Sequence, residues 1–120
     1  MKESDTKFGI YVHVPFCSRR CDYCSFATWT DKEHLIEQYL ASCKAQADKW
    51  LPQLPSVTSI FVGGGTPNLV PASLLMNVVS ELPLADEVEF TVECNPDLVT
   101  SSQMETYVKA GVNRISLGVQ

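Results

Sequence analysis

Three cysteines, Cys17, Cys21 and Cys24, lie within eight residues of one another in the segment YVHVPFCSRRCDYCSF (residues 11–26). Cysteine thiolates are soft ligands that suit zinc or iron–sulfur clusters. Three thiolates can hold a four-iron cluster in which one iron is left uncapped. Such an iron is an open coordination position for a small molecule that chelates it through an amine and a carboxylate. The spacing therefore favours a metal centre that binds a ligand directly.

Zinc and ferredoxin-type sites fit this cysteine loop less well. A structural zinc site needs four ligands, usually as two separated pairs. The fourth would have to come from residues that are not in register with the loop, namely His13, His34, Cys43 or Cys94. The bacterial ferredoxin run has a different spacing and a fourth cysteine. We expect Cys43 and Cys94 to pack as small apolar side chains.

The composition limits the classes of protein and partner. The chain has 120 residues, of which 45% are hydrophobic and 19% charged, as in a single globular unit. Its net charge of -5 argues against nucleic acid as a partner and against an electrostatic membrane anchor. The N-terminus lacks the apolar core of a signal peptide, and no apolar run approaches the roughly 20 residues of a spanning helix. An odd number of cysteines suits a reducing compartment, so we expect a cytoplasmic protein without a membrane span.

Strands and helices alternate along the sequence. Residues 8–14 alternate between apolar and other side chains, with Val12 and Val14 on one face and Tyr11 and His13 on the other. Capping signals mark helix starts at Thr30–Glu33 and Thr100–Gln103, and Gly111 is expected to end the last helix. The patterns predict strands at 8–14, 57–62, 87–93 and 114–119, and helices at 31–51, 71–82 and between 100 and 111.

This order predicts an α/β fold with a parallel sheet and right-handed crossovers. Both a doubly wound open sheet and part of a (β/α) barrel fit it. In either fold, ligands bind at the carboxyl ends of the strands, where the cysteine loop, the glycine-rich turn, Glu93 and Gln120 fall. A full barrel has roughly 250 residues, so we expect the chain to be a fragment of one.

The run GGGTP, residues 63–67, has two explanations. It is either a plain strand-to-helix turn or a place where the backbone approaches a ligand closely, and three consecutive glycines exceed what a turn requires. It is neither G-x-G-x-x-G nor a P-loop, because Asn68 stands where the last glycine would be and no GK[ST] follows. A nucleotide phosphate site is therefore not expected. For Glu93 the alternatives are a ligand contact and an ordinary surface carboxylate.

The cysteine motif, with an aromatic residue before its last cysteine and a strand before it, resembles the radical S-adenosylmethionine superfamily. More narrowly, YVHVPFC, GGGTP, the E-x-N-P of residues 93–96 and GVNRISLGVQ resemble the oxygen-independent coproporphyrinogen III oxidase group and its HemW relatives. The resemblance implies a partial (β/α)6 TIM-like barrel. Residues 1–120 would be the N-terminal part of its core domain, without the rest of the barrel or a C-terminal domain.

The resemblance also implies a set of cofactor residues. Cys17, Cys21 and Cys24 match the ligands of a [4Fe-4S] cluster. The glycine-rich turn matches the segment that meets the methionine moiety of S-adenosylmethionine, and Glu93 matches a glutamate that binds the cofactor's hydroxyls or amino group. The positions implied for S-adenosylmethionine are Tyr11, Tyr23, Gly64, Gly65, Thr66, Glu93 and Gln120.

One residue separates two branches of the resemblance. The oxidase group usually has a further cysteine two places after the third cluster ligand, and this chain has Phe26 there. That difference favours a HemW-like heme chaperone that delivers heme to an acceptor protein. The alternatives are the oxidase, which acts on a porphyrinogen by radical decarboxylation of propionate side chains, and a zinc-stabilised binding module. Whether the protein is an enzyme stays open at this point.

Overall fold

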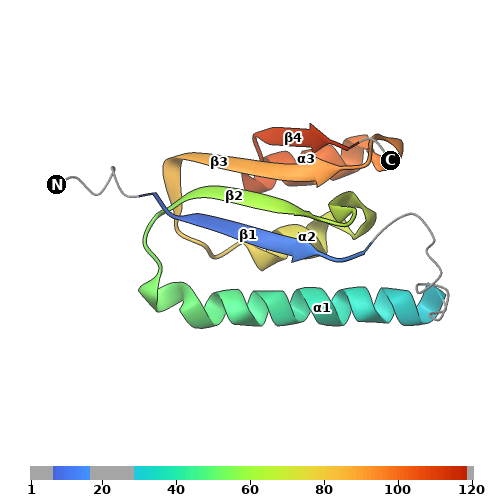
Figure 1. The fold of residues 1–120 in the computed structure, drawn as a ribbon, viewed down its shortest axis with the longest axis horizontal. Coiled ribbons are helices and arrows are strands. Elements are labelled where there is room, and N and C mark those ends of the chain that lie inside the picture. Colours follow the sequence, from blue (N-terminus) through green and yellow to red (C-terminus); the bar gives the residue numbers. More distant parts are fainter. Residues whose placement is uncertain (1–6, 17–28, 119–120) are drawn as a thin grey trace.

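The computed structural model describes residues 7–16 and 29–118, and Figure 1 shows the arrangement of its elements. Strands alternate with helices from the first described residues to the last. The elements in chain order are β1 (Gly9–Val14), α1 (Trp29–Trp50), β2 (Val57–Gly64), α2 (Ala72–Val78), β3 (Leu84–Cys94), α3 (Ser101–Ala110) and β4 (Arg114–Leu117). Short 3-10 turns follow α1, β2 and β3: η3 (Leu51–Gln53), η4 (Pro67–Leu69) and η5 (Pro96–Leu98).

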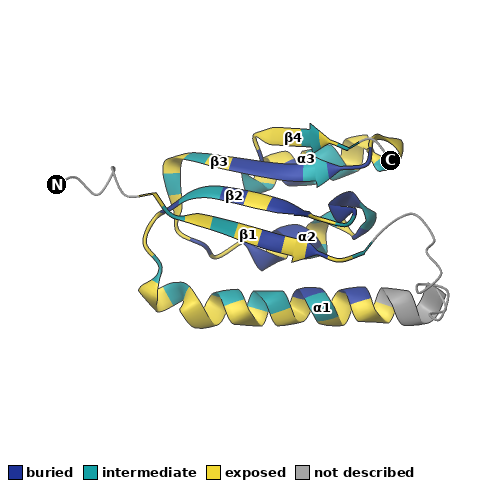
Figure 2. Ribbon diagram, viewed as in Figure 1, coloured by how far each residue is buried: buried dark blue, intermediate teal, exposed yellow. Residues whose placement is uncertain are grey.

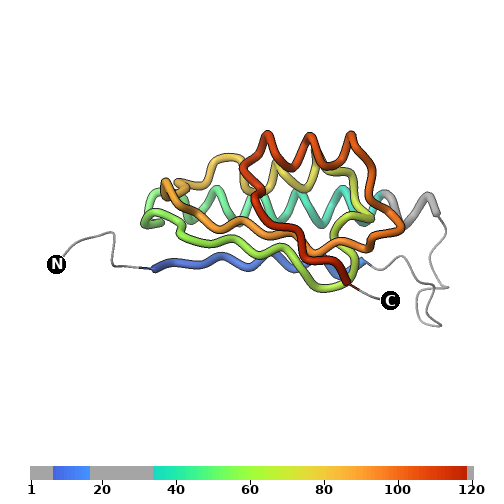
Figure 3. The backbone as a smooth tube through the Cα atoms, turned by 90° about the horizontal axis from the view of Figure 1, so that it is seen from above, coloured from blue at the N-terminus to red at the C-terminus, as the bar shows by residue number. Residues whose placement is uncertain are grey.

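The four strands form one parallel sheet in the order β1-β2-β3-β4. One row of paired residues runs straight across it, through Val12, Val62, Val92 and Ile115. The helices α1, α2 and α3 lie on the same side of the sheet, as the view from above makes plain (Figure 3). The predicted α/β class with parallel strands is therefore confirmed.

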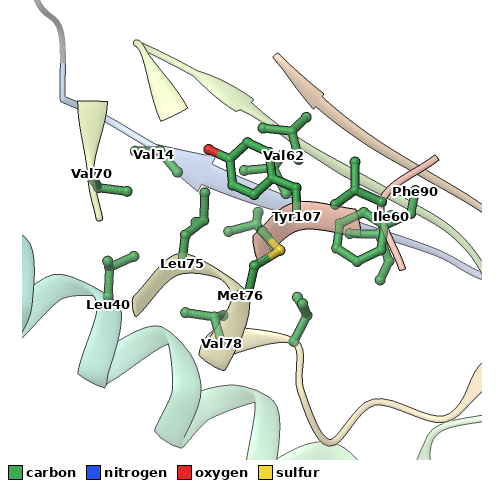
Figure 4. Packing of buried hydrophobic residues seen from close by; sticks show 14 of the residues in the cluster. Val14, Leu40, Ile60, Val62, Val70, Leu75, Met76, Val78, Phe90 and Tyr107 are labelled. Carbon is green, nitrogen blue, oxygen red and sulfur yellow. The ribbon is translucent and has the colours of Figure 1, made fainter. Parts of the chain in front are cut away.

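The core lies between the sheet and these helices. Strand residues alternate, so that one set faces the helices and is buried (Figure 2). Valines and larger side chains from strands and helices pack together in this layer (Figure 4): Val14, Ile60, Val62, Phe90, Leu40, Leu75 and Tyr107. On the other face of the sheet Tyr11 and Phe61 are exposed. The expected division of the first strand into a buried and an open face is confirmed.

The capping box predicted at Thr100–Gln103 is present in its Thr100 half, whereas the Gln103 side chain bonds Asn68. The Thr100 hydroxyl accepts a hydrogen bond from Gln103 N at 3.1 Å, which satisfies one free amide of the first turn of α3. Gly111 ends that helix in the left-handed conformation, with φ of +109°. The side chains of Thr30 and Glu33 lie outside the described residues.

The bounds of several elements differ from the prediction; β3, expected at 87–93, runs from Leu84 to Cys94. The helix expected at 71–82 ends at Val78, and the chain continues in turns. Val79 N bonds Met76 O three residues back, and the Ser80 hydroxyl donates to Asn77 O at 2.9 Å, which offers the backbone an alternative to helix. The strand β2 runs two residues past the expected 57–62, to Gly64, because ladder pairing with β1 needs no side chain.

No helix in the described part of the chain combines the length and the apolar character needed to cross a membrane.

Candidate functional site

The carboxyl ends of β1, β2 and β3 meet at one edge of the sheet. Val14, the last residue of β1, pairs with Gly64, the last residue of β2. The ladder between β2 and β3 is paired as far as Val62 and Val92, and both strands continue by two residues beyond that point. The glycine-rich turn and the loop after Glu93 are therefore neighbours at this edge, as the topology predicted.

The glycine-rich turn is tied by its amides to the end of β1. Gly65 N donates to Val14 O at 2.7 Å, and Thr66 N donates to Phe16 O at 2.6 Å. These bonds continue the β1–β2 ladder past the end of both strands. Phe16 directly precedes Cys17 in the sequence, so the turn is held against the segment that leads into the cysteine loop.

Two of the three glycines have local reasons in the structure. Gly64 has φ of +115°, a conformation that residues with a side chain rarely adopt. A Cβ at Gly64 would lie 2.7 Å from His13 Nδ1. A Cβ at Gly63 would lie 2.7 Å from Glu93 Oε1 and 2.7 Å from Phe61 Cε1. The glycines therefore make room for three neighbouring side chains as well as for the turn.

Glu93 is held over this turn. Its Oε1 accepts a hydrogen bond from Gly64 N at 3.2 Å, and the side chain is only partly exposed. This contact places the carboxylate beside the glycine-rich turn on the neighbouring strand, unlike a surface carboxylate that makes no contact.

Taken together, these groups form an acceptor-rich edge. The amides of Gly64, Gly65 and Thr66 already donate to protein acceptors. What the edge offers a ligand is therefore chiefly the oxygens of the Glu93 carboxylate. Such a set of hydrogen-bond acceptors fits a ligand that carries an ammonium group and does not fit a phosphate. This agrees with the absence of a P-loop pattern from the sequence. The amino group of S-adenosylmethionine fits these groups chemically.

An aromatic cluster occupies the open face of the sheet beside this edge. Tyr11, 57% exposed, stacks on Phe61 with ring centroids 6.0 Å apart and 12° between the ring planes. Its hydroxyl lies 3.4 Å from His13 Nδ1, and the His13 ring in turn lies over Gly64. The sequence reasoning selected Tyr11 and missed Phe61. The signal was present, because Ile60 and Val62 on either side of Phe61 face the core.

Several predicted site residues lie outside the described residues. These are Cys17, Cys21, Cys24, Tyr23 and Gln120, together with Phe26. Among the residues that the structure describes, no group of three or more histidine, cysteine, aspartate or glutamate side chains could hold a metal ion. The proposed cluster ligands therefore remain a prediction from the sequence.

The two other cysteines behave as packing residues. Cys94 is buried in the core, and that burial raises the pKa of its thiol to about 11. Cys43 is partly buried on α1, and burial raises the pKa of its thiol as well. Since a thiolate is the metal-binding form, both positions disfavour ligation. The expectation that they pack as small apolar side chains is confirmed for Cys94.

A largely apolar cavity of about 640 Å³ lies between β1 and α1. Residues of β1, α1 and the turns after α2 line it, including Ile10, Val12, Tyr39, Cys43 and Val79. No carboxylate, lysine or arginine is found among its described lining residues. Tyr11 and His13 also line it, so the cavity reaches the aromatic cluster near the carboxyl end of β1.

Comparison with known proteins identifies the family of the chain. A model of the Radical SAM superfamily matches residues 11–120. The chain is 40% identical over 119 residues to the heme chaperone HemW of Escherichia coli (strain K12), and 37% identical over 123 residues to HemW of Haemophilus influenzae. Each match covers 93% of this chain and 32% of the relative.

The oxidase branch matches at a similar level. The oxygen-independent coproporphyrinogen III oxidase of Paracoccus denitrificans is 36% identical over 120 residues, with 93% of this chain and 27% of that protein covered. Among solved structures, coproporphyrinogen III oxidase (HemN) from Escherichia coli, described as a Radical SAM enzyme, superposes with a TM-score of 0.76 at 26% identity. That match covers 95% of this chain and 28% of the HemN chain.

The chain thus spans about a third of the length of the HemW relatives that it matches, and its four parallel strands with their helices match part of the HemN barrel. The family model covers nearly the whole chain, and the parallel strands bring the glycine-rich turn and Glu93 together where the cysteine loop begins. The chain therefore belongs to the Radical SAM superfamily, with HemW and HemN among its relatives.

Proposed function

We propose that this chain is the N-terminal part of a HemW-like heme chaperone, which binds a [4Fe-4S] cluster, S-adenosylmethionine and heme and delivers heme to an acceptor protein. The observation that carries the proposal is the bond from Thr66 N to Phe16 O, because it ties the glycine-rich turn to the residue before Cys17. A ligand held at the turn is therefore placed next to the start of the cysteine loop.

The cluster and S-adenosylmethionine have proposed residues in this sequence. Cys17, Cys21 and Cys24 would hold the cluster, which supplies an iron with an open coordination position. For S-adenosylmethionine, the amino group is assigned to the Glu93 carboxylate, which lies beside Gly64. The remaining proposed contacts with S-adenosylmethionine come from Tyr11, Tyr23, Gly65, Thr66 and Gln120.

The chain's own residues would orient this ligand in two ways. The Glu93 carboxylate is held by Gly64 N, so its position is fixed before a ligand arrives. The stacked pair Tyr11 and Phe61 forms an aromatic surface on the open face of the sheet, against which an apolar or planar part of a ligand can pack.

The oxidase is the second candidate function. Its relative from Paracoccus denitrificans is 36% identical to this chain, and HemW relatives range from 32% to 40%, so overall identity does not separate the two. Phe26 in place of the cysteine expected for the oxidase favours the chaperone. Under either function we expect a protein of the cytoplasm.

The cluster is tested with the protein at the full length of its relatives, reconstituted with iron and sulfide without oxygen. It should become brown and bind iron, and Cys21→Ala should lose most of that iron. Cys94→Ala is the matched control, because its thiol is buried in the core, and it should keep the iron. Stoichiometric zinc with no iron would instead support the zinc-stabilised module.

The branch is tested on the same protein. A heme titration should show saturable uptake, and an anaerobic assay with S-adenosylmethionine, a reductant and coproporphyrinogen III should yield no protoporphyrinogen IX. Sustained formation of protoporphyrinogen IX would overturn the chaperone assignment and leave the cluster and cofactor residues as proposed.

A further inference from the structure

The side chain of Asn68 holds the loop that follows β3. Asn68 lies in η4, just after the glycine-rich turn, and is only 4% exposed. Its Nδ2 donates to Asn95 O at 3.0 Å, and its Oδ1 accepts from Asn95 N at 2.8 Å. Both polar groups of the side-chain amide therefore bond the main chain of Asn95, as two paired residues do in a β-ladder.

A third element joins this contact, which we call the Asn68 clamp. Gln103, in the first turn of α3, donates from Nε2 to Asn68 O at 2.9 Å. Its Oε1 also lies 3.4 Å from Asn68 Nδ2. Asn95 completes the arrangement, since its own side chain accepts from Asp97 N at 2.9 Å and turns the chain into η5. The clamp thus joins η4, the loop after β3 and α3.

The clamp spans the gap between two strands whose ladder has ended. The register of β2 and β3 is paired up to Val62 and Val92. Beyond that row, side chains link the two strand ends: Glu93 Oε1 to Gly64 N, and Asn68 to Asn95. Asn68 is four residues after Gly64, and Asn95 is two residues after Glu93. Loosening the clamp would therefore loosen the two segments that directly follow Gly64 and Glu93.

We infer that Asn68 is a positioning residue for ligand binding at the strand ends: it sets the separation between the glycine-rich turn and the Glu93 carboxylate. The inference rests on the proposed binding of S-adenosylmethionine. Only a side chain with both a donor and an acceptor satisfies Asn95 N and O together. Aspartate has the same shape but no donor, and it would place a negative charge against Asn95 O in a buried position.

The chain offers a control in a second asparagine, which bonds the main chain in the middle of β3. Asn113 Oδ1 accepts from Phe90 N at 2.9 Å, and its Nδ2 donates to Val88 O at 2.8 Å. The chemistry is the same amide-to-backbone pairing on β3. Asn113, however, is exposed and lies directly before β4, so its bonds reach the middle of β3 and not the strand ends that form the site.

The experiment compares Asn68→Asp with Asn113→Asp in the protein at full length with its cluster reconstituted. Equilibrium dialysis measures the Kd for S-adenosylmethionine, and urea unfolding measures stability. Asn68→Asp should raise Kd about tenfold, whereas Asn113→Asp should leave it within about twofold, even though both lose stability. Because Kd is measured without urea, on protein that the unfolding curves show to be folded, a loss of stability alone does not change it.

A second variant covers the case in which Asn68→Asp does not fold. Gln103 is partly exposed on α3, and Gln103→Ala removes its hydrogen bond to Asn68 O without introducing a buried charge. It should raise Kd about threefold. An unchanged Kd in the folded Asn68→Asp variant, or in Gln103→Ala if the former does not fold, would overturn the inference alone. Wild-type protein that fails to bind S-adenosylmethionine would overturn the proposed function and the inference with it.

Discussion

Replacing Gly64 by alanine tests the conformation of the glycine-rich turn directly. Gly64 has φ of +115°, and a non-glycine residue held in so sparsely populated a region costs about 1–3 kcal/mol. The added Cβ would also lie 3.0 Å from Val14 O, a carbonyl already engaged by Gly65 N. Backbone atoms cannot rotate away, so we expect a total loss of about 2–3 kcal/mol in the free energy of unfolding.

Two comparisons separate the contributions. Gly111→Ala is the matched control, because Gly111 has φ of +109° while an added Cβ would meet only Phe90 Cδ2 at 3.7 Å and Leu84 Cδ1 at 3.8 Å, which are ordinary contacts. It should therefore show the cost of the backbone conformation alone. In a His13→Ala background, Gly64→Ala should lose nearly the same free energy, because the exposed His13 ring can move aside at little cost.

Urea unfolding followed by circular dichroism gives these free energies. A smaller loss for Gly64→Ala than for Gly111→Ala would contradict this prediction. The two glycines have a similar φ, and only at Gly64 would an added Cβ come close to a backbone atom. The prediction would also be refuted if the cost disappeared in the His13→Ala background, because the loss would then come from the histidine ring and not from the backbone.

Three further predictions concern single side chains. Tyr107 is 1% exposed, and its hydroxyl has no hydrogen-bond partner among the described residues. In thermal unfolding, Tyr107→Phe should leave the free energy of unfolding unchanged or raise it by up to about 1 kcal/mol; a clear loss would reveal a partner. Thr100→Ala removes the cap of α3 and should cost about 1 kcal/mol in urea unfolding, whereas Thr100→Asp should restore most of it; equal losses in both would argue against capping. The Cys94 thiol has its pKa raised by burial to about 11, so the folded state keeps a proton that the unfolded state releases above about pH 9; stability should fall between pH 9 and 11, and Cys94→Ala should flatten that fall.

The sequence predicted the architecture well because its signals are local. Alternation along β1 identified the buried Val12 and Val14, and capping residues marked both ends of α3. The parallel order then placed the glycine-rich turn and Glu93 at one edge. None of these steps requires knowledge of which side chains meet across the fold.

The missed features depend on contacts between distant segments. Asn68 looked only like an interruption of a glycine pattern, since its bonds to Asn95 join residues 27 positions apart. The stack of Tyr11 on Phe61 joins residues on different strands. The early end of α2 coincides with a hydrogen bond from the Ser80 hydroxyl to Asn77 O, which competes with helical backbone bonding. Hydrophobic periodicity does not predict such a bond.

The order of the strands in the sheet is the order in which they are synthesised. Each new strand pairs with the one made just before it, and the helix between them covers the same face. A nascent chain therefore never has to open an existing strand pair in order to insert a later strand. Each βα unit that leaves the ribosome can add to the free edge of the preceding strand, so the sheet can grow in one direction during translation. The strand ends that form the site would then be assembled in sequence, with the β1 edge first, the glycine-rich turn next and the Glu93 loop after it.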